Sequence, residues 1–127
     1  MKELTEKEIL YIHYTLAKRK GKAPGVRDIS LLKAAVLRPK SKFQGQELYP
    51  DVYAKAAALT QFILKSRPFN SLNTSAGIAI GAPYLKKNNI SLKAPEEELL
   101  RLGERAGKGN LEVKELITWF RHYSEER

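Results

Sequence analysis

Apolar side chains recur every three or four residues through most of this chain, a spacing typical of amphipathic helices. A first helix is predicted to begin after Thr5, because Thr5 and Glu8 have capping-box spacing and Leu4 and Ile9 that of a hydrophobic staple. Gly21 is expected to end this helix. Its apolar face is predicted to contain Ile9, Ile12, His13 and Leu16.

Further helical segments follow, and each is bounded by a proline, a glycine or a capping residue. The second is expected to stop before Pro39, and Pro50 is expected to occupy the first position of the third, which runs towards Ser66. No alternation of apolar and polar residues is long enough to predict a strand, so the sequence predicts an all-α fold. The later segments are predicted to start at Asp28, Pro50, Ala76 and Pro95, and the last one after a cap at Asn110.

The segment from Ala76 to Lys87 is apolar on nearly every side, which predicts a central, buried helix. Gly77 and Gly81 are four residues apart, so a neighbouring helix can approach closely on that side. We expect one of these glycines to pack against the helix formed by residues 52–63. Pro83 is expected to bend or break the central helix.

Length and composition limit the classes of protein to consider. A chain of 127 residues is expected to form one domain, residues 1–127, with a single modest core. It contains no cysteine, which excludes disulfides and thiolate chemistry within it. No apolar run is long enough to cross a bilayer, and the first residues do not resemble a signal peptide, so we expect a cytoplasmic protein. No zinc-ligand spacing or Ser-His-Asp arrangement is present, and we predict no metal site.

Positive charge is concentrated in the first half of the chain. The formal net charge is +9, and residues 1–66 contain 13 Lys/Arg against 6 Asp/Glu. Nine basic residues and one acid, Asp28, lie between Lys18 and Lys42. Such a segment attracts nucleic acid, nucleotide phosphates or an acidic peptide. The alternative, a solvated basic surface that maintains solubility, stays open.

The segment Arg67–Ser75 reads Arg-Pro-Phe-Asn-Ser-Leu-Asn-Thr-Ser and resembles the active-site motif of the Fic/Doc family, His-Pro-Phe-x-Asp-Gly-Asn-Lys-Arg. Pro68, Phe69 and Asn73 match this motif. Other stretches that are similar to the Doc-like branch (death-on-curing toxins) occur in the same order along the chain. They are Ile12-His13, Pro24-Gly25-Val26-Arg27-Asp28, Arg38-Pro39, Glu47-Leu48-Tyr49-Pro50 and Trp119-Phe120-Arg121.

The resemblance implies a compact bundle of about six helices around a central buried helix. It also implies transfer of a phosphoryl or nucleotidyl group from ATP, with Mg²⁺, to a protein hydroxyl. Arg67 replaces the family's histidine base and Ser71 its Mg²⁺-binding acid, while Leu72 replaces its glycine. A guanidinium stays protonated and a serine carries no charge for Mg²⁺, so the degenerate positions Arg67, Ser71 and Asn73 predict a non-catalytic member.

An anion or a nucleotide phosphate is still expected to bind, although the side chains that the family uses for transfer are replaced. The positions Arg67, Asn73, Thr74 and Ser75 precede or begin the central helix and are candidate ligands for an anion or a nucleotide phosphate. Helix capping by Ser71, Asn73, Thr74 or Ser75 is the competing interpretation. Lys42, Phe43 and Gln44 lie where the family has a flap that positions its target protein, and an ordinary surface loop is the alternative there.

Three functions remain open at this point. The first is a non-catalytic Doc-like domain that binds an acidic, antitoxin-like peptide or a translation-related target. The second is an active ATP-dependent phosphotransferase or nucleotidyltransferase toxin with a rearranged site, in which Arg67 stabilises phosphate. The third is a basic nucleic-acid-binding module that uses the segment from Lys18 to Lys42.

Overall fold

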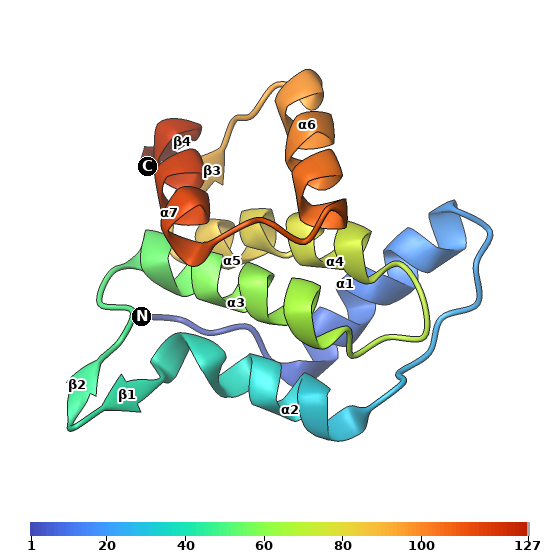
Figure 1. Cartoon of the computed structure of the whole chain (residues 1–127), viewed down its shortest axis with the longest axis horizontal. Coiled ribbons are helices and arrows are strands. Elements are labelled where there is room, and N and C mark those ends of the chain that lie inside the picture. The colour runs from blue at the N-terminus through green and yellow to red at the C-terminus, as the bar shows by residue number, and fades with distance from the viewer. Residues whose placement is uncertain (127) are drawn as a thin grey trace.

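A helix interrupted near its middle lies at the centre of the computed structural model, which describes residues 1–126 (Figure 1). Its halves are α4 (Asn73–Ala79) and α5 (Gly81–Lys87). If these halves count as one helix, the described residues form the predicted all-α bundle of about six helices. The others are α1 (Glu6–Arg19), α2 (Ile29–Leu37), α3 (Val52–Ser66), α6 (Glu96–Gly107) and α7 (Val113–His122).

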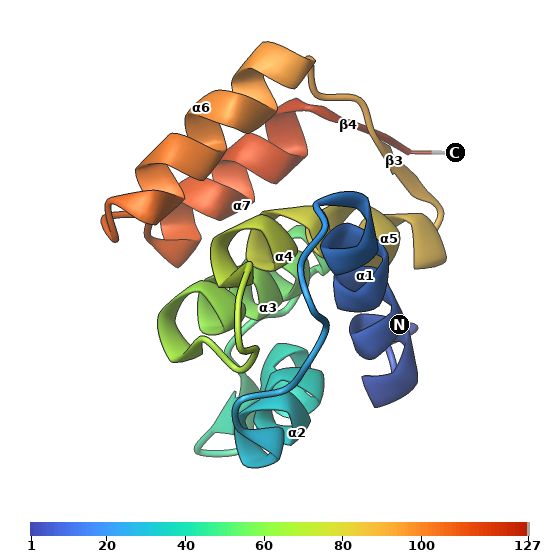
Figure 2. The same ribbon diagram turned by 90° about the vertical axis from the view of Figure 1, so that its right-hand side faces the viewer.

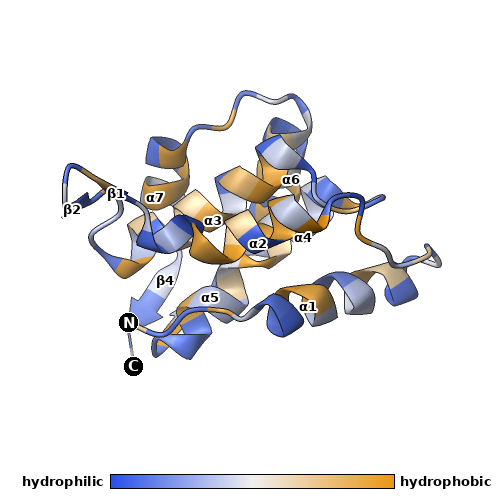
Figure 3. Ribbon diagram, turned by 90° about the horizontal axis from the view of Figure 1, so that it is seen from below, coloured by the Kyte–Doolittle hydropathy of each residue, from blue (hydrophilic) through white to orange (hydrophobic). Residues whose placement is uncertain are grey.

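The helices pack in layers around α3, α4 and α5. Figure 2 shows α6 and α7 lying across one side of these three helices and α2 on the opposite side, with α1 along the edge. Helix α3 has the most enclosed position, and every residue from Ala54 to Thr60 is buried. Four of these seven residues are alanines, and their small side chains allow neighbouring helices to approach closely. Viewed from below in Figure 3, hydrophobic residues gather on α3 and α4.

The first two helices begin where the sequence predicts. The Thr5 hydroxyl accepts a hydrogen bond from the backbone N–H of Glu8 at 3.1 Å, and the Glu8 carboxylate accepts one from the N–H of Thr5 at 2.9 Å. This reciprocal pair is the predicted capping box, which is confirmed. At α2, the Asp28 carboxylate accepts from the N–H of Ser30 at 2.9 Å. Both signals are local in sequence, which is why they could be identified without the fold.

The third helix begins two residues later than predicted. Pro50 lies outside the helix, and α3 starts at Val52. The Asp51 carboxylate accepts a hydrogen bond from the N–H of Ala54 at 2.8 Å. A carboxylate cap satisfies one of the N–H groups that a helix start leaves without a partner, whereas proline at a first position satisfies none. The assignment of Pro50 to the first helical position was therefore wrong.

Pro83 explains the interruption of the central helix. Proline has no N–H, so Pro83 cannot donate to the carbonyl of Ala79 four residues earlier, and α4 ends at Ala79. The predicted break is confirmed, at Ile80. The predicted start at Ala76 was wrong, because the helix already begins at Asn73.

The two glycines of the central helix face different neighbours. A Cβ atom added at Gly77 would lie 2.8 Å from Leu64 Cδ2 and 3.4 Å from the carbonyl oxygen of Thr60. This confirms that one glycine packs against α3. A Cβ atom at Gly81 would lie 2.5 Å from Cζ of Phe120 in α7. The interrupted helix therefore packs closely against α3 through α4 and against α7 through α5.

Two short strand pairs add to the helices, although the sequence predicted no strand. They have two or three residues per strand, which is too short for an alternating pattern to be detected. The first pair forms a hairpin between η1, a single 3-10 turn (Arg38–Lys40), and α3, and the second joins the end of the described chain to the segment after α5. The strands are β1 (Lys42–Phe43), β2 (Gln46–Glu47), β3 (Ile90–Leu92) and β4 (Ser124–Glu126).

Within residues 1–126, no helix is both long and apolar enough to pass through a lipid bilayer.

Replacing Gly81 by alanine should lower the free energy of unfolding by about 1–3 kcal/mol, because the new methyl group overlaps the Phe120 ring. Gly103 in α6 is the matched control, since no atom lies within 4 Å of its added Cβ. Gly103→Ala should raise stability by about 0.4–1 kcal/mol. Urea unfolding monitored by circular dichroism measures both. Equal stabilities for Gly81→Ala and the unmodified chain would contradict the assigned packing of α5 on α7.

Candidate functional site

The loop between α3 and α4 begins and ends in left-handed backbone. Arg67, at the end of α3, has a φ of 53°, and Leu72, just before α4, has a φ of 60°. A side chain with a Cβ atom disfavours this conformation by about 1–2 kcal/mol relative to the right-handed one. Glycine adopts it without that cost, which gives a physical reason for the family's glycine at the position of Leu72. The turn forms here in spite of the substitution.

The segment before α2 holds this loop in place through backbone groups. The Arg27 guanidinium donates from Nε to the carbonyl oxygen of Arg67 and from Nη2 to that of Ser66, each at 2.7 Å. The N–H groups of Arg27 and Asp28 both donate to the carbonyl oxygen of Pro68, at 2.8 and 3.1 Å. These contacts depend on the loop backbone and not on its side chains, so they tolerate the substitutions in the motif.

Asn73 uses both of its polar side-chain atoms to close the loop. Its Oδ1 accepts from the N–H of Phe69 and its Nδ2 donates to the carbonyl oxygen of Phe69, both at 2.9 Å. Asn73 is only 3% exposed. No side chain caps α4 within the described chain, so the prediction of a side-chain cap at Ser71, Asn73, Thr74 or Ser75 was wrong. Both polar atoms of the Asn73 side chain are thus engaged with the Phe69 backbone, and the proposed role of Asn73 in anion binding stays a prediction.

His13 of α1 also contacts the loop and stabilises it. Its ring stacks on the Phe69 ring with centroids 3.9 Å apart and an interplanar angle of 4°. Its Nε2 lies 2.9 Å from the carbonyl oxygen of Ser71, and since a carbonyl only accepts, Nε2 must carry the proton. His13 is 2% exposed. The predicted place of His13 on the apolar face of the first helix is confirmed.

The other candidate ligands lie at the surface. The Arg67 side chain is exposed and has no hydrogen bond or ion pair to any residue in the range 1–126. Thr74 and Ser75 are half-buried on α4, and the Lys20 ammonium lies 3.5 Å from the Ser75 hydroxyl. Lys20 was not among the predicted site residues, because only the fold brings α1 beside α4. Anion binding at Arg67, Thr74 and Ser75 stays a prediction.

The side chains of the loop do not match the requirements of the family's transfer reaction. Between Arg67 and Ser75 no carboxylate is present to bind Mg²⁺, which prefers charged oxygen ligands. No group of three or more His, Asp or Glu side chains suited to a metal ion occurs in the part of the chain that the structure describes. Arg67 stands at the position of the base and remains protonated at physiological pH. The residues present therefore do not fit ATP with Mg²⁺ in the family's arrangement.

The predicted flap is the β1–β2 hairpin. Gln44 and Gly45 form its turn with φ values of 50° and 81°, as a two-residue type I′ turn requires. Lys42, Phe43 and Gln44 are all exposed, and Phe43 reaches 64%. A large exposed aromatic side chain at the tip of a hairpin is available to another molecule. Contact with a partner there stays a prediction.

A buried lysine, which the sequence analysis did not identify, fixes the hairpin to the body of the protein. The Lys55 side chain of α3 is 3% exposed, and its Nζ donates to Glu47 Oε1 at 2.8 Å and to the carbonyl oxygen of Pro39 at 3.0 Å. The hydrogen bond from Lys55, followed by its charge, lowers the pKa of the Glu47 carboxyl. The ion pair is thus present at neutral pH and is lost as the pH falls through that lowered pKa. The available sequence signal was a single lysine within the alanine-rich stretch of residues 54–58.

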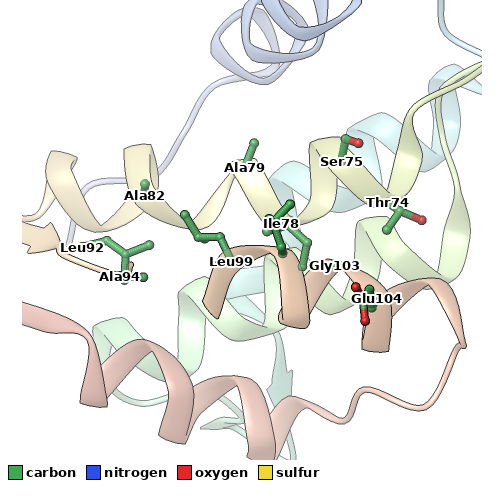
Figure 4. Close-up of a pocket in the computed structure, with 11 residues that line it drawn as sticks. Thr74, Ser75, Ile78, Ala79, Ala82, Leu92, Ala94, Leu99, Gly103 and Glu104 are labelled. Atoms are coloured by element: carbon green, nitrogen blue, oxygen red, sulfur yellow. The ribbon is translucent and has the colours of Figure 1, made fainter. Parts of the chain in front are cut away.

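A largely apolar groove runs beside the loop along α4 and α5. Between these helices and α6 lies a cavity of about 610 Å³, lined among others by Ser75, Ile78, Ala79 and Leu99 (Figure 4). Ala79 also lines a smaller hollow of about 250 Å³ on the side of α1. Positions 75, 78, 79 and 82 form one face of the central helix, so this apolar face is open between α1 and α6.

Asn73→Ala should lower the free energy of unfolding by about 1–3 kcal/mol, because it leaves the buried N–H of Phe69 without an acceptor. Thr74→Ala is the matched control, since the Thr74 side chain is half-buried and makes no hydrogen bond to a described residue, and it should change stability by less than about 0.5 kcal/mol. Thermal unfolding compares the two variants. Similar losses in both would show that the Asn73–Phe69 hydrogen bonds contribute no more than surface contacts.

Comparisons with known proteins identify the family to which the chain belongs. The model of the Fic/DOC family matches residues 3–85, which is well over half of the chain. The chain is also 36% identical over 69 residues to the protein named Toxin Doc from Mycolicibacterium smegmatis. That match covers 54% of this chain and 53% of the relative, so the chain spans about half the length of the curated protein it matches. The loop, the buried Phe69 and all but the last two residues of the central helix lie within the matched residues, and the chain belongs to the Fic/Doc family.

Proposed function

We propose that this protein is a non-catalytic Doc-like domain that binds an acidic, amphipathic segment of a partner protein. The observation that carries the proposal is the open apolar face of the interrupted central helix, beside a loop that lacks the histidine and the acidic residue of the family motif. Binding requires the groove and the fold, and neither depends on the residues that the motif has lost.

The absence of catalysis follows from the chemistry of the loop. A transfer to a protein hydroxyl needs a base that takes the proton, and a guanidinium at position 67 cannot do so. The transferred phosphoryl group also needs metal and cationic partners, and the loop offers Ser71, Thr74 and Ser75 at those positions. The remaining motif residue, Asn73, is engaged with Phe69.

The surroundings of the groove support a partner of mixed apolar and acidic character. Large apolar side chains are exposed on both walls, namely Tyr11 on α1 at 69% and Leu100 on α6 at 62%. The two walls differ in charge. The end of α1 contributes Lys18, Arg19 and Lys20, whereas Glu104 lies on the side of α6. An amphipathic segment is therefore expected to place its apolar side on the groove and its acidic side towards α1.

The purified protein should transfer neither the terminal phosphate nor the nucleotidyl group of ATP to itself or to the proteins of a translation extract. ATP labelled at the γ or the α phosphate distinguishes the two transfers. Arg67→His should not restore activity, because Mg²⁺ and the phosphates would still lack partners. Stoichiometric transfer that disappears in Asn73→Asp would contradict the proposal and would favour the rearranged enzyme.

A charge placed in the groove should weaken binding of an acidic amphipathic peptide. Ala79→Glu introduces a carboxylate where both hollows meet, and we expect at least about a tenfold loss of affinity, which corresponds to about 1.4 kcal/mol. Lys86→Gln, at an exposed position of α5 outside the groove, lowers the net charge by one as Ala79→Glu does and is the matched control. Fluorescence anisotropy with a helical Glu/Leu peptide and its scrambled version measures the effect. Equal losses in the two variants would indicate non-specific attraction only.

A further inference from the structure

Helix α7 presents a second, polar and aromatic face that does not belong to the core. Its core face packs inward through Leu116 and Phe120, which are 0% and 1% exposed. A different set of positions, again at helical spacing, lies on its flank beside α6. We call this set the α7 flank, and it consists of Lys114, Glu115, Thr118, Trp119, His122 and Tyr123.

The α7 flank and Arg105 of α6 enclose a pocket of about 450 Å³. Pockets for small ligands commonly range from about 300 to 1,000 Å³, so this one can hold a molecule of the size of a mononucleotide. The pocket is separate from the groove on α4 and α5, with which it shares no lining residue. It also lies outside the residues that match the family model, 3–85.

Three aromatic rings meet at the pocket. The Trp119 and Tyr123 ring centroids are 4.8 Å apart with an interplanar angle of 53°, and those of His122 and Tyr123 are 4.6 Å apart at 88°. Because none of these pairs is parallel, their ring faces are not stacked on each other. Trp119 is partly buried and packs against the core. A planar heterocycle that stacks on such a ring gains about 1–3 kcal/mol.

Charged groups stand beside these rings. Arg105 donates from Nη2 to the Glu115 carboxylate across the gap between α6 and α7, which leaves its other N–H groups for a ligand. Lys114 is exposed and forms no ion pair with any residue in the range 1–126. The lining residues contribute two cations and one carboxylate, and Glu98, which hydrogen-bonds the Tyr123 hydroxyl, is paired with Arg101, so the net charge around the pocket is positive and favours an anion. The Glu115 carboxylate can accept a hydrogen bond from an amino group.

We propose that this pocket binds a nucleoside monophosphate, with its base on Trp119 and Tyr123 and its phosphate at Lys114 and Arg105. A planar ring without a phosphate would leave the two cations without a charged partner. A phosphate without a ring would leave the aromatic faces exposed to water. A ligand that joins both fits the pocket. The site is independent of the proposed partner groove, so either can exist without the other.

The single tryptophan of the chain makes a direct test feasible, because it contributes one indole N–H signal to a nitrogen–proton NMR spectrum. Titration with AMP should shift this signal of Trp119 to saturation. Adenosine and inorganic phosphate should each bind at least about tenfold more weakly, since each retains only one of the two interactions. No saturable shift with AMP would overturn the proposal. So would equal affinity for AMP and phosphate.

Two lysine variants distinguish specific binding of AMP in the pocket from non-specific electrostatic attraction to the protein surface. Lys114→Gln should weaken AMP binding by about tenfold, because a charged hydrogen bond to the phosphate is lost. Lys108→Gln removes the same charge from the exposed turn after α6, outside the pocket, and should leave the affinity within about twofold. Equal losses in both variants, or AMP-induced shifts confined to residues 67–75, would overturn the assignment of the pocket.

Discussion

Phe69 is held in the core by two hydrogen bonds between its own backbone and the Asn73 side chain, and three separate segments of the chain meet around it. His13 of α1 stacks on its ring, and Val26, in the segment before α2, forms an isolated β-bridge with it. These contacts place the end of α3 and the start of α4 at fixed positions. Without these contacts, the interrupted central helix would have no defined start. The groove would then lose the helix that lines one of its sides.

The same arrangement explains how a family loop persists although most side chains of the family motif are replaced. The backbone of the loop is bound from outside by Arg27 and Asp28, and its one retained polar side chain, Asn73, points inward. The positions that would act on a substrate point to the surface and make few contacts, so their replacement costs the fold little. Leu72 is the exception, since it adopts a left-handed conformation that glycine would adopt without strain.

The interruption of the central helix connects the core with the surfaces available for binding. Because α4 ends at Ala79, its two halves pack on different neighbours, with Gly77 against α3 and Gly81 against α7. The opposite face of the same helix, around Ile78 and Ala79, is left open between α1 and α6. Close packing on one side thus coexists with an exposed apolar face on the other.

The sequence by itself determined the features that depend on neighbouring residues: the caps at Thr5 and Asp28, the break caused by Pro83, the all-α class and the family motif. These could be predicted because capping and the missing N–H of proline act within about four residues. Only the tertiary structure decided which residues meet across the chain. It buried Lys55 under the hairpin, stacked His13 on Phe69, brought Lys20 to Ser75 and placed Arg105 beside Trp119. Such contacts join residues that are far apart in sequence or on separate helices, and no local pattern specifies them, because the packing of whole helices sets those distances.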